Sequence, residues 1–291
     1  MYKVFLSILG LLLITQCNYE KKAEKVDIKN EPVQKEVNHL VIGNDYFLSG
    51  DYESALHHYS EAIILDTANA VIYNNIAELY ELQESYDRAS VYFNISITKD
   101  PMNPLTYNNR GELRVILYDF KGAMRDFDKA VLLDPNCGVA YLNRGELKLQ
   151  NQDIEGALKD YELCIKNDPY NPVAYNNRGD IKELNGDFKD AIIDFSEAIK
   201  IDSNYAFAYV NRAYSKKAIK DYTGALKDYD RSIELAPKQG LFYYDRAALK
   251  FEIGDLNGAC EDWQTAKMKG FPYSKYDSLI NEYCYSINIV N

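Results

Sequence analysis

Few side chains in this sequence have the type and spacing that catalysis or metal binding would need. The histidines are His39, His57 and His58. Because adjacent residues on a helix point about 100° apart, His57 and His58 cannot share one ion, and a site would have to combine His39 with His58 and with ligands from elsewhere. No nucleophile–base set and no glycine-rich phosphate loop is recognisable. We therefore predict no catalytic residue, no metal and no cofactor, and packing or surface roles for the histidines.

The five cysteines are too few to hold a chain of 291 residues together by disulfides. Cys164 belongs to a recurring column of small residues, and we expect it to be buried in packing. Cys260 and Cys284 are close enough in sequence to pair in an oxidising compartment. We expect free thiols here, with an oxidised Cys260–Cys284 pair as the alternative.

Arginine and aspartate recur together with a fixed separation of 16 residues. The arginines are Arg110, Arg144, Arg178, Arg212 and Arg246, and the aspartates are Asp126, Asp160, Asp194, Asp228 and Asp262. In an antiparallel helical hairpin these two positions lie near each other, and a guanidinium can bind one carboxylate through two N–H groups. We predict five structural ion pairs that clamp the helices of a repeat or join adjacent repeats. Ligand binding by these residues is the alternative.

These residues belong to a unit of 34 residues that occurs seven times. Alanine recurs without slippage at Ala55, Ala89, Ala123, Ala157, Ala191, Ala225 and Ala259. With this alanine as the twentieth position, the repeats are 36–69, 70–103, 104–137, 138–171, 172–205, 206–239 and 240–273. Position 8 is always Gly or Ala, position 24 is aromatic and position 27 is small. Since these positions form single stripes on two successive helices, each unit is predicted to be a hairpin that buries its apolar face against its neighbours.

This pattern resembles the tetratricopeptide repeat, and the resemblance covers residues 36–273. The family implies an all-α fold, a right-handed superhelical solenoid of seven 34-residue helix–turn–helix repeats. Residues 274–291 carry apolar residues at helical spacing and are expected to form a capping helix. Members of the family commonly hold an extended or helical peptide on the concave face lined by their first helices. The resemblance therefore implies a non-catalytic protein–protein interaction scaffold.

Asparagine and acidic side chains dominate the stripe that would face this groove. Position 6 carries Asn75, Asn109, Asn143, Asn177 and Asn211, and position 9 carries Glu78, Glu112, Glu146 and Asp180. Amides can donate to and accept from a peptide backbone, and carboxylates attract positive charge. We predict that these residues bind a neutral or cationic protein segment. The alternative is that the acidic residues merely solvate a helix face.

The chain begins like an exported protein. The apolar run of residues 4–14 follows Lys3, is too short to span a bilayer and fits the core of a signal peptide. It is followed by Cys17, and this arrangement resembles a bacterial lipoprotein signal, in which the cysteine is lipidated. We assign 1–17 to a signal peptide, predict lipidation at Cys17, and read 18–35 as a flexible tether. A plain secretory signal with an incidental cysteine is the alternative.

Charge and composition restrict the class of molecule that this protein is expected to bind. A net charge of −11 disfavours nucleic acid, we expect no small-molecule substrate, and membrane contact is expected only through the lipid at Cys17. We predict a scaffold or adaptor of the bacterial cell envelope, with the periplasmic or surface side left open. Lipoproteins that assemble outer-membrane or pilus proteins combine an anchor with such repeats, so an assembly factor is one alternative. A self-assembling structural component of the envelope is another.

Overall fold

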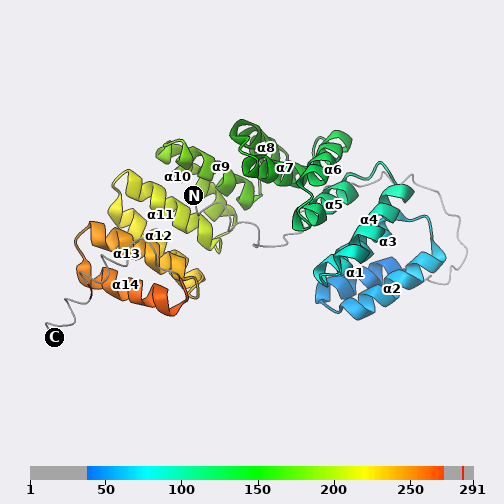
Figure 1. The fold of residues 1–291 in the computed structure, drawn as a ribbon, viewed down its shortest axis with the longest axis horizontal. Coiled ribbons are helices and arrows are strands. Elements are labelled where there is room, and N and C mark those ends of the chain that lie inside the picture. The colour runs from blue at the N-terminus through cyan, green and yellow to red at the C-terminus, as the bar shows by residue number, and fades with distance from the viewer. Residues whose placement is uncertain (1–37, 272–283, 285–291) are drawn as a thin grey trace, which may run out of the picture. The chain divides into compact units, whose positions relative to one another are not determined.

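The computed structural model describes residues 38–271 and Cys284, and the secondary structure of these residues is entirely helical (Figure 1). The helices are α1 (His39–Ser49), α2 (Tyr52–Leu65), α3 (Ala70–Leu82), α4 (Tyr86–Lys99), α5 (Pro104–Ile116), α6 (Phe120–Leu133), α7 (Gly138–Gln150), α8 (Ile154–Asn167), α9 (Pro172–Leu184), α10 (Phe188–Ile201), α11 (Ala206–Ala218), α12 (Tyr222–Leu235), α13 (Gly240–Glu252) and α14 (Leu256–Met268). The expected all-α fold of helix–turn–helix repeats is confirmed. The predicted signal peptide (1–17), tether (18–35) and, apart from Cys284, capping helix (274–291) lie outside the described residues.

The helices group into two compact units. Among the described residues, unit 1 runs from 38 to 167 and holds α1–α8, and unit 2 runs from 168 to 271, with Cys284, and holds α9–α14. Each odd-numbered helix packs against the even-numbered helix that follows it, and inside each unit every hairpin packs on the next one. Among the described helices, none has the length and apolarity needed to cross a membrane.

Polar caps fix where the helices begin. The second helix of most repeats is capped by an aspartate, as in Asp119, which accepts a hydrogen bond from the amide of Gly122 at 2.9 Å. Several first helices are capped by an asparagine, as in Asn103, which accepts from the amide of Leu105 at 3.0 Å. These side chains satisfy amides that have no partner inside the helix. The 34-residue spacing therefore recurs in the caps as well as in the core.

The residue just before the N-cap of the second helix adopts a left-handed backbone in every repeat, and this cap is an aspartate in all repeats except the second, where it is Ser85. The values of φ lie between 57° and 88° at Gly50, Glu84, Tyr118, Gln152, Gly186, Lys220 and Gly254. The sequence shows a Gly-Asp turn in only three of these repeats. The other four residues adopt the same conformation at a steric cost that glycine avoids.

Small residues and aromatic rings form the core of each hairpin. Every repeated alanine at position 20 is fully buried, and the aromatic side chain at position 24 is buried beside it. A Cβ atom placed on Gly111 would lie 2.5 Å from the ring of Phe127. The glycine is therefore required by the close approach of the two helices rather than by the turn, as the sequence pattern predicts.

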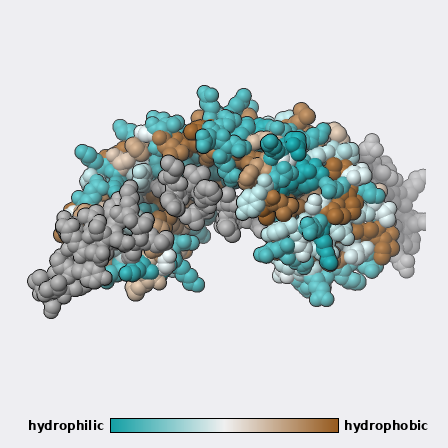
Figure 2. Space-filling view, viewed as in Figure 1, coloured by the Kyte–Doolittle hydropathy of each residue, from teal (hydrophilic) through white to brown (hydrophobic). Residues whose placement is uncertain are grey.

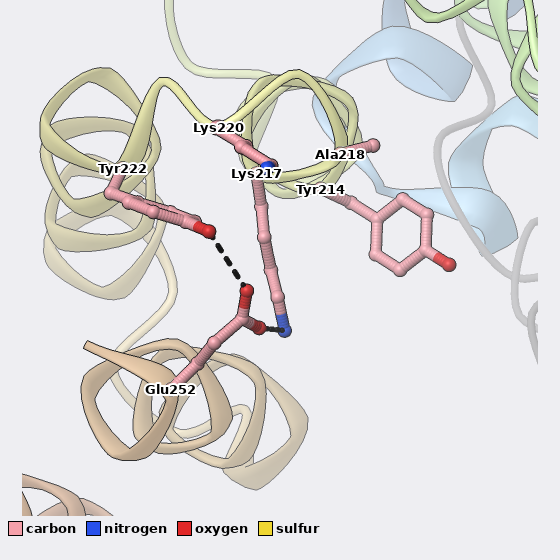
Figure 3. Close-up of a pocket in the computed structure, with 6 residues that line it drawn as sticks. All are labelled: Tyr214, Lys217, Ala218, Lys220, Tyr222 and Glu252. Atoms are coloured by element: carbon pink, nitrogen blue, oxygen red, sulfur yellow. Dashed lines mark hydrogen bonds and ion pairs between the residues drawn. The ribbon is translucent and has the colours of Figure 1, made fainter. Parts of the chain in front are cut away.

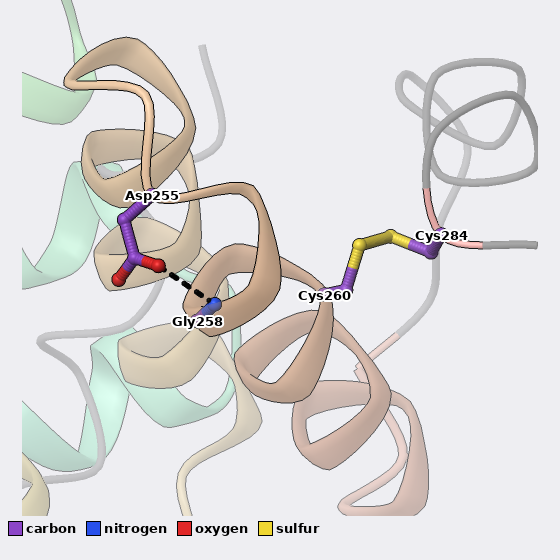
Figure 4. The surroundings of a disulfide bond; sticks show 4 residues. All are labelled: Asp255, Gly258, Cys260 and Cys284. Carbon is purple, nitrogen blue, oxygen red and sulfur yellow. Dashed lines mark hydrogen bonds between the residues drawn. A yellow bond between two sulfur atoms is a disulfide. The ribbon is translucent and has the colours of Figure 1, made fainter. Parts of the chain in front are cut away.

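Cys260 and Cys284 form a disulfide, with their Cα atoms 5.4 Å apart (Figure 4). The expectation of free thiols is therefore wrong for this pair. Cys260 lies on α14, and its buried partner comes from the chain beyond the last described helix. The bond joins α14 to a segment that the repeat pattern does not include. Cys164 is buried, as expected.

Candidate interaction surfaces

Each of the five arginine–aspartate pairs forms inside a single repeat, between its first and second helix. In repeat 3, Arg110 donates from Nε and Nη2 to the two carboxylate oxygens of Asp126 at 2.9 and 2.7 Å. The same two-pronged contact recurs at Arg144–Asp160, Arg178–Asp194, Arg212–Asp228 and Arg246–Asp262. All five aspartates are buried. The pairs therefore clamp the hairpins.

A third charged residue completes each clamp, and the sequence analysis did not assign it. Position 11 carries Arg114, Lys148, Lys182, Lys216 and Lys250 in repeats 3 to 7. Each of these side chains contacts the same aspartate as the arginine, at 2.6–2.9 Å. Position 11 could have been identified from the sequence, because it is tyrosine in repeats 1 and 2 and becomes basic where the arginine and aspartate first occur. We call the three residues the ionic clamp.

The clamp arginine also reaches the preceding repeat. Arg144 donates from Nη1 to Asp128 at 2.9 Å, and Arg246 donates in the same way to Asp230 at 2.6 Å. The guanidinium group also lies over the position-4 tyrosine of its own helix, 5.4 Å from the ring centroid for Arg144 over Tyr141. The two roles predicted for the arginines, clamping a repeat and joining adjacent repeats, are therefore carried by the same side chain.

Most of the position-6 asparagines that are predicted to line the groove form hydrogen bonds to the preceding repeat. Asn143 donates from Nδ2 to Asn108 at 3.0 Å and to Glu112 in the preceding repeat. Asn109 donates in the same way to Asn74 and Glu78. In unit 2, Asn211 donates to Asn176 at 3.1 Å and to Asp180 at 2.8 Å. Asn75 donates to Asn44 of the first repeat at 2.8 Å, and Asn177 lies buried on α9.

These contacts place the predicted groove residues in rows along the first helices. In unit 1, α3 lies against α5 and α5 against α7, and Glu146 on α7 occupies the position equivalent to Glu78 and Glu112. We call the unit 1 set the amide–carboxyl row: Asn75, Glu78, Glu81, Asn109, Glu112, Asn143 and Glu146. Both N–H groups of Asn109 and Asn143 are engaged, so these amides can only accept from a partner, and the carbonyl oxygen of Asn109 already accepts from Asn108 at 3.3 Å. Contact between the row and a peptide stays a prediction.

Three carboxyl groups of the row, Glu78, Glu81 and Glu112, are hard to ionise. Burial raises the pKa of Glu78 to about 7, against a hydrogen bond from Asn74 that lowers it. Burial, with Glu112 and Glu78 close by, raises the pKa of Glu81 to about 8. Burial also raises the pKa of Glu112. At neutral pH this face therefore carries less negative charge than a count of its residues indicates, and the charge depends on pH.

Unit 2 has a different surface at its sixth and seventh repeats. A hollow of about 250 Å³ is lined by Tyr214, Lys217, Ala218, Lys220, Tyr222 and Glu252 (Figure 3). Lys217 on α11 contacts Glu252 on α13 at 3.0 Å, and Tyr222 donates to the same carboxyl at 3.2 Å. The hydrogen bond from Lys217 lowers the pKa of Glu252. Lys217 occupies the repeat position of Glu81, so the acidic character of the unit 1 row does not extend to this hollow.

Exposed apolar side chains are spread among hydrophilic ones on the visible surface (Figure 2). Among the described residues, Tyr118 on the turn after α5 and Leu184 at the end of α9 are large exposed side chains in different units. Scattered apolar residues are normal on a protein surface. The polar rows and the hollow are therefore the better candidates for specific contacts.

Family models support the repeat assignment directly. Residues 43–84 match a model described as TPR repeat, and residues 142–206 and 208–239 match models described as tetratricopeptide repeat. Stress-induced-phosphoprotein 1 of Caenorhabditis elegans is 45% identical over 58 residues, which are 20% of this chain and 17% of that protein. The match thus spans only a small part of the curated relative's length.

Solved structures share the fold. The Cut9–Hcn1 hetero-tetramer of the APC/C matches with a TM-score of 0.70 and 16% identity, over 87% of this chain and 50% of that chain. PilW, described as a type IV pilus biogenesis factor, matches with a TM-score of 0.60 and 22% sequence identity. The match covers 68% of this chain and 92% of PilW. A tetratricopeptide repeat protein of Parabacteroides merdae matches with a TM-score of 0.58 and 19% sequence identity. The match covers 84% of this chain and 95% of that chain. With its 34-residue hairpins and these family matches, the chain is a tetratricopeptide repeat protein.

Proposed function

We propose that this protein is an exported scaffold of the bacterial cell envelope that holds an extended or helical protein segment against the first helices of its repeats. Tetratricopeptide repeats indicate a protein–protein interaction scaffold and generally have no catalytic role. The amide–carboxyl row of unit 1 is the observation on which the binding site rests. Its side chains are held in place by hydrogen bonds between repeats, so they are already ordered before a partner arrives.

The row favours partners that donate hydrogen bonds or carry positive charge. The N–H groups of Asn109 and Asn143 are engaged, so what the row presents to a partner is acceptors: the carbonyl oxygen of Asn143, and the lone pairs of Asn109, Glu78 and Glu112 that the asparagine amides do not use. Backbone amides, lysine and arginine are the complementary groups. A neutral or cationic segment therefore fits the row better than an acidic one.

Charge reversal on the row tests the binding site. Partners are crosslinked in envelopes and recovered with the wild-type chain and with a Glu112→Lys, Glu146→Lys variant. The matched control is Glu155→Lys with Glu162→Lys, which places the same charges on exposed positions of α8. We expect the row variant to lose most of the captured partner and the control to keep it, with equal helix content by circular dichroism. Equal capture by all three chains would remove the row as the binding site.

Export and anchoring are tested separately at the N-terminus. The proposal rests on the apolar run of residues 4–14 and on Cys17, which resemble a lipoprotein signal. A Cys17→Ser chain is expected to leave the membrane fraction and to lose incorporation of a labelled fatty acid. A wild-type chain that takes up no label would contradict lipidation, while partner capture by the row could still hold.

A more specific version of this function is an assembly factor for pilus or outer-membrane proteins. The likeness to PilW, described as a type IV pilus biogenesis factor, favours it. This support is an analogy of fold, and fold does not fix function. Recovery of a pilus or outer-membrane subunit in the crosslinking experiment would support it. Light scattering of the mature chain tests the self-assembling alternative, which requires oligomers in the absence of any partner.

A further inference from the structure

Two histidines from different helices meet in the first repeat. The Nδ1 atoms of His39 on α1 and His58 on α2 are 3.0 Å apart. Both side chains are half-buried, and the ring of Tyr46 stacks on that of His58 with centroids 5.4 Å apart. The pair is therefore held between the helices of the hairpin and does not lie free on the surface.

His58 occupies the aspartate position of the ionic clamp of repeats 3 to 7, and His39 lies beside it. His39 stands where those repeats have the tyrosine beneath the arginine, and His58 stands where they have the aspartate. The two cationic positions of the clamp are Ile42 and Tyr46 in this repeat. No clamp cation is therefore present to compete for the imidazole lone pairs or to repel a positive ion.

We propose that His39 and His58 bind a divalent transition-metal ion that joins α1 to α2. Imidazole nitrogen is a preferred ligand of Zn²⁺, Ni²⁺ and Cu²⁺. With metal–nitrogen bonds of about 2.0–2.1 Å, two ligands are about 2.9 Å apart at a right angle and about 3.3 Å apart at the tetrahedral angle. The observed 3.0 Å lies inside this range. In repeat 1 the ion would link the two helices of the hairpin, as the ionic clamp does in repeats 3 to 7.

The proton balance of this step is simple. A hydrogen bond between the two Nδ1 atoms requires one ring to carry its hydrogen on Nδ1 and the other to accept it with its lone pair. A metal ion needs both Nδ1 lone pairs, so the donating ring moves its hydrogen to Nε2 by exchange with solvent. The hydrogen is moved within the donating ring and not lost, and both Nδ1 lone pairs are then available to the ion.

The site has two protein ligands in the part of the chain that the structure describes. No group of three or more histidine, cysteine, aspartate or glutamate side chains able to hold a metal occurs among the described residues. Water would complete the coordination shell. An open site of this kind favours Ni²⁺, Cu²⁺ and Zn²⁺ over Mg²⁺, which prefers oxygen ligands.

Calorimetric titration of the untagged full-length chain with NiCl₂ and ZnCl₂ tests the proposal. We expect binding of one ion per chain, which His39→Gln and His58→Gln each weaken by more than about tenfold, since loss of even an outer-shell partner costs that much. His57→Gln is the matched control, because His57 is an exposed neighbour on the same helix, and it should bind as wild type does. MgCl₂ should give no heat from this site, which separates it from the carboxyl row.

A second measurement guards against misfolded variants. Helix content by circular dichroism should match wild type for all three substitutions, and NiCl₂ should raise the Tm of wild type and His57→Gln only. Absence of stoichiometric binding in wild type would overturn the proposal. So would binding that survives in both His39→Gln and His58→Gln, or that disappears in His57→Gln.

Discussion

At the scale of single residues, the ionic clamp contains a buried carboxylate held by two cations. Asp160 is 1% exposed and contacts Arg144 at 2.7 Å and Lys148 at 2.8 Å. Removal of the carboxylate would leave two partly buried positive charges without their partner. Repeat 2 solves the same packing problem without charges, because Ile76, Tyr80 and Tyr92 occupy the equivalent positions and the two tyrosine rings lie 5.5 Å apart.

We therefore expect two variants of the ionic clamp to have opposite effects on stability. Asp160→Ala should lower the free energy of unfolding by about 3–5 kcal/mol. The triple variant Arg144→Ile, Lys148→Tyr, Asp160→Tyr copies repeat 2 and should recover most of that loss, because a buried ionic group can be replaced by well-packed apolar residues. Urea denaturation of the three chains measures both effects. A triple variant as unstable as Asp160→Ala would contradict this view of the clamp.

Backbone conformation at the turn gives a second prediction at this scale. Gln152 has φ of 65° and Gly186, at the equivalent position of the next repeat, has φ of 85°. Gln152→Gly should raise the free energy of unfolding by about 0.5–1 kcal/mol, because glycine removes the steric cost of the left-handed backbone. Gly186→Ala should lower it by about 1 kcal/mol for the opposite reason. Thermal unfolding followed by circular dichroism compares the two, and a destabilised Gln152→Gly chain would refute the argument.

At the scale of helices, the half-buried glutamates of the amide–carboxyl row make the free energy of unfolding of unit 1 decrease as pH rises. The pKa of Glu81 is about 8 in the folded chain and 4.5 in its unperturbed state. The folded state therefore binds more protons between these values, and stability falls as pH rises from about 5 to 8. Glu81→Gln mimics the protonated form at every pH. It should raise stability by less than about 1 kcal/mol near pH 5 and by about 4 kcal/mol at pH 8.

Denaturation at both pH values measures this effect. Glu261→Gln is the control, since Glu261 is an exposed glutamate on α14 in the other unit, and it should leave the pH dependence of stability as it is. If Glu81→Gln gave the same small change at both pH values, the burial of Glu81 would not be the cause of the pH dependence.

The sequence predicted the helices, the core columns and the arginine–aspartate pairs, because these depend on spacing within one 34-residue unit. It did not predict how the amides bond, since Asn143 meets Asn108 across 35 residues and only the stacking of hairpins brings them together. Nor did it predict the Cys260–Cys284 disulfide, whose second cysteine lies beyond the repeats. The His39–His58 contact was named as a condition for metal binding, but its distance required the structure.

At the scale of the whole molecule, the negative net charge gains a specific meaning. The chain carries a formal charge of −11 when every carboxyl is counted as ionised. Glu78 and Glu81, with pKa values of about 7 and 8, are partly protonated at neutral pH. A positively charged segment on the row would favour their carboxylate forms and so lower these pKa values. Binding of such a partner must therefore release protons near neutral pH.

This linkage fixes the sign of the pH dependence of binding. Because protons are released, affinity for a cationic segment should rise from pH 6 to pH 8, whereas a neutral segment should bind with little change. Calorimetry of the crosslinked partner segment in phosphate and in Tris, two buffers with different ionisation enthalpies, counts the protons. A Glu78→Gln, Glu81→Gln, Glu112→Gln chain should show no proton release and a flat pH profile. Proton uptake by the wild-type chain would contradict a cationic partner, and equal proton release by the triple variant would show that the linkage lies outside the row.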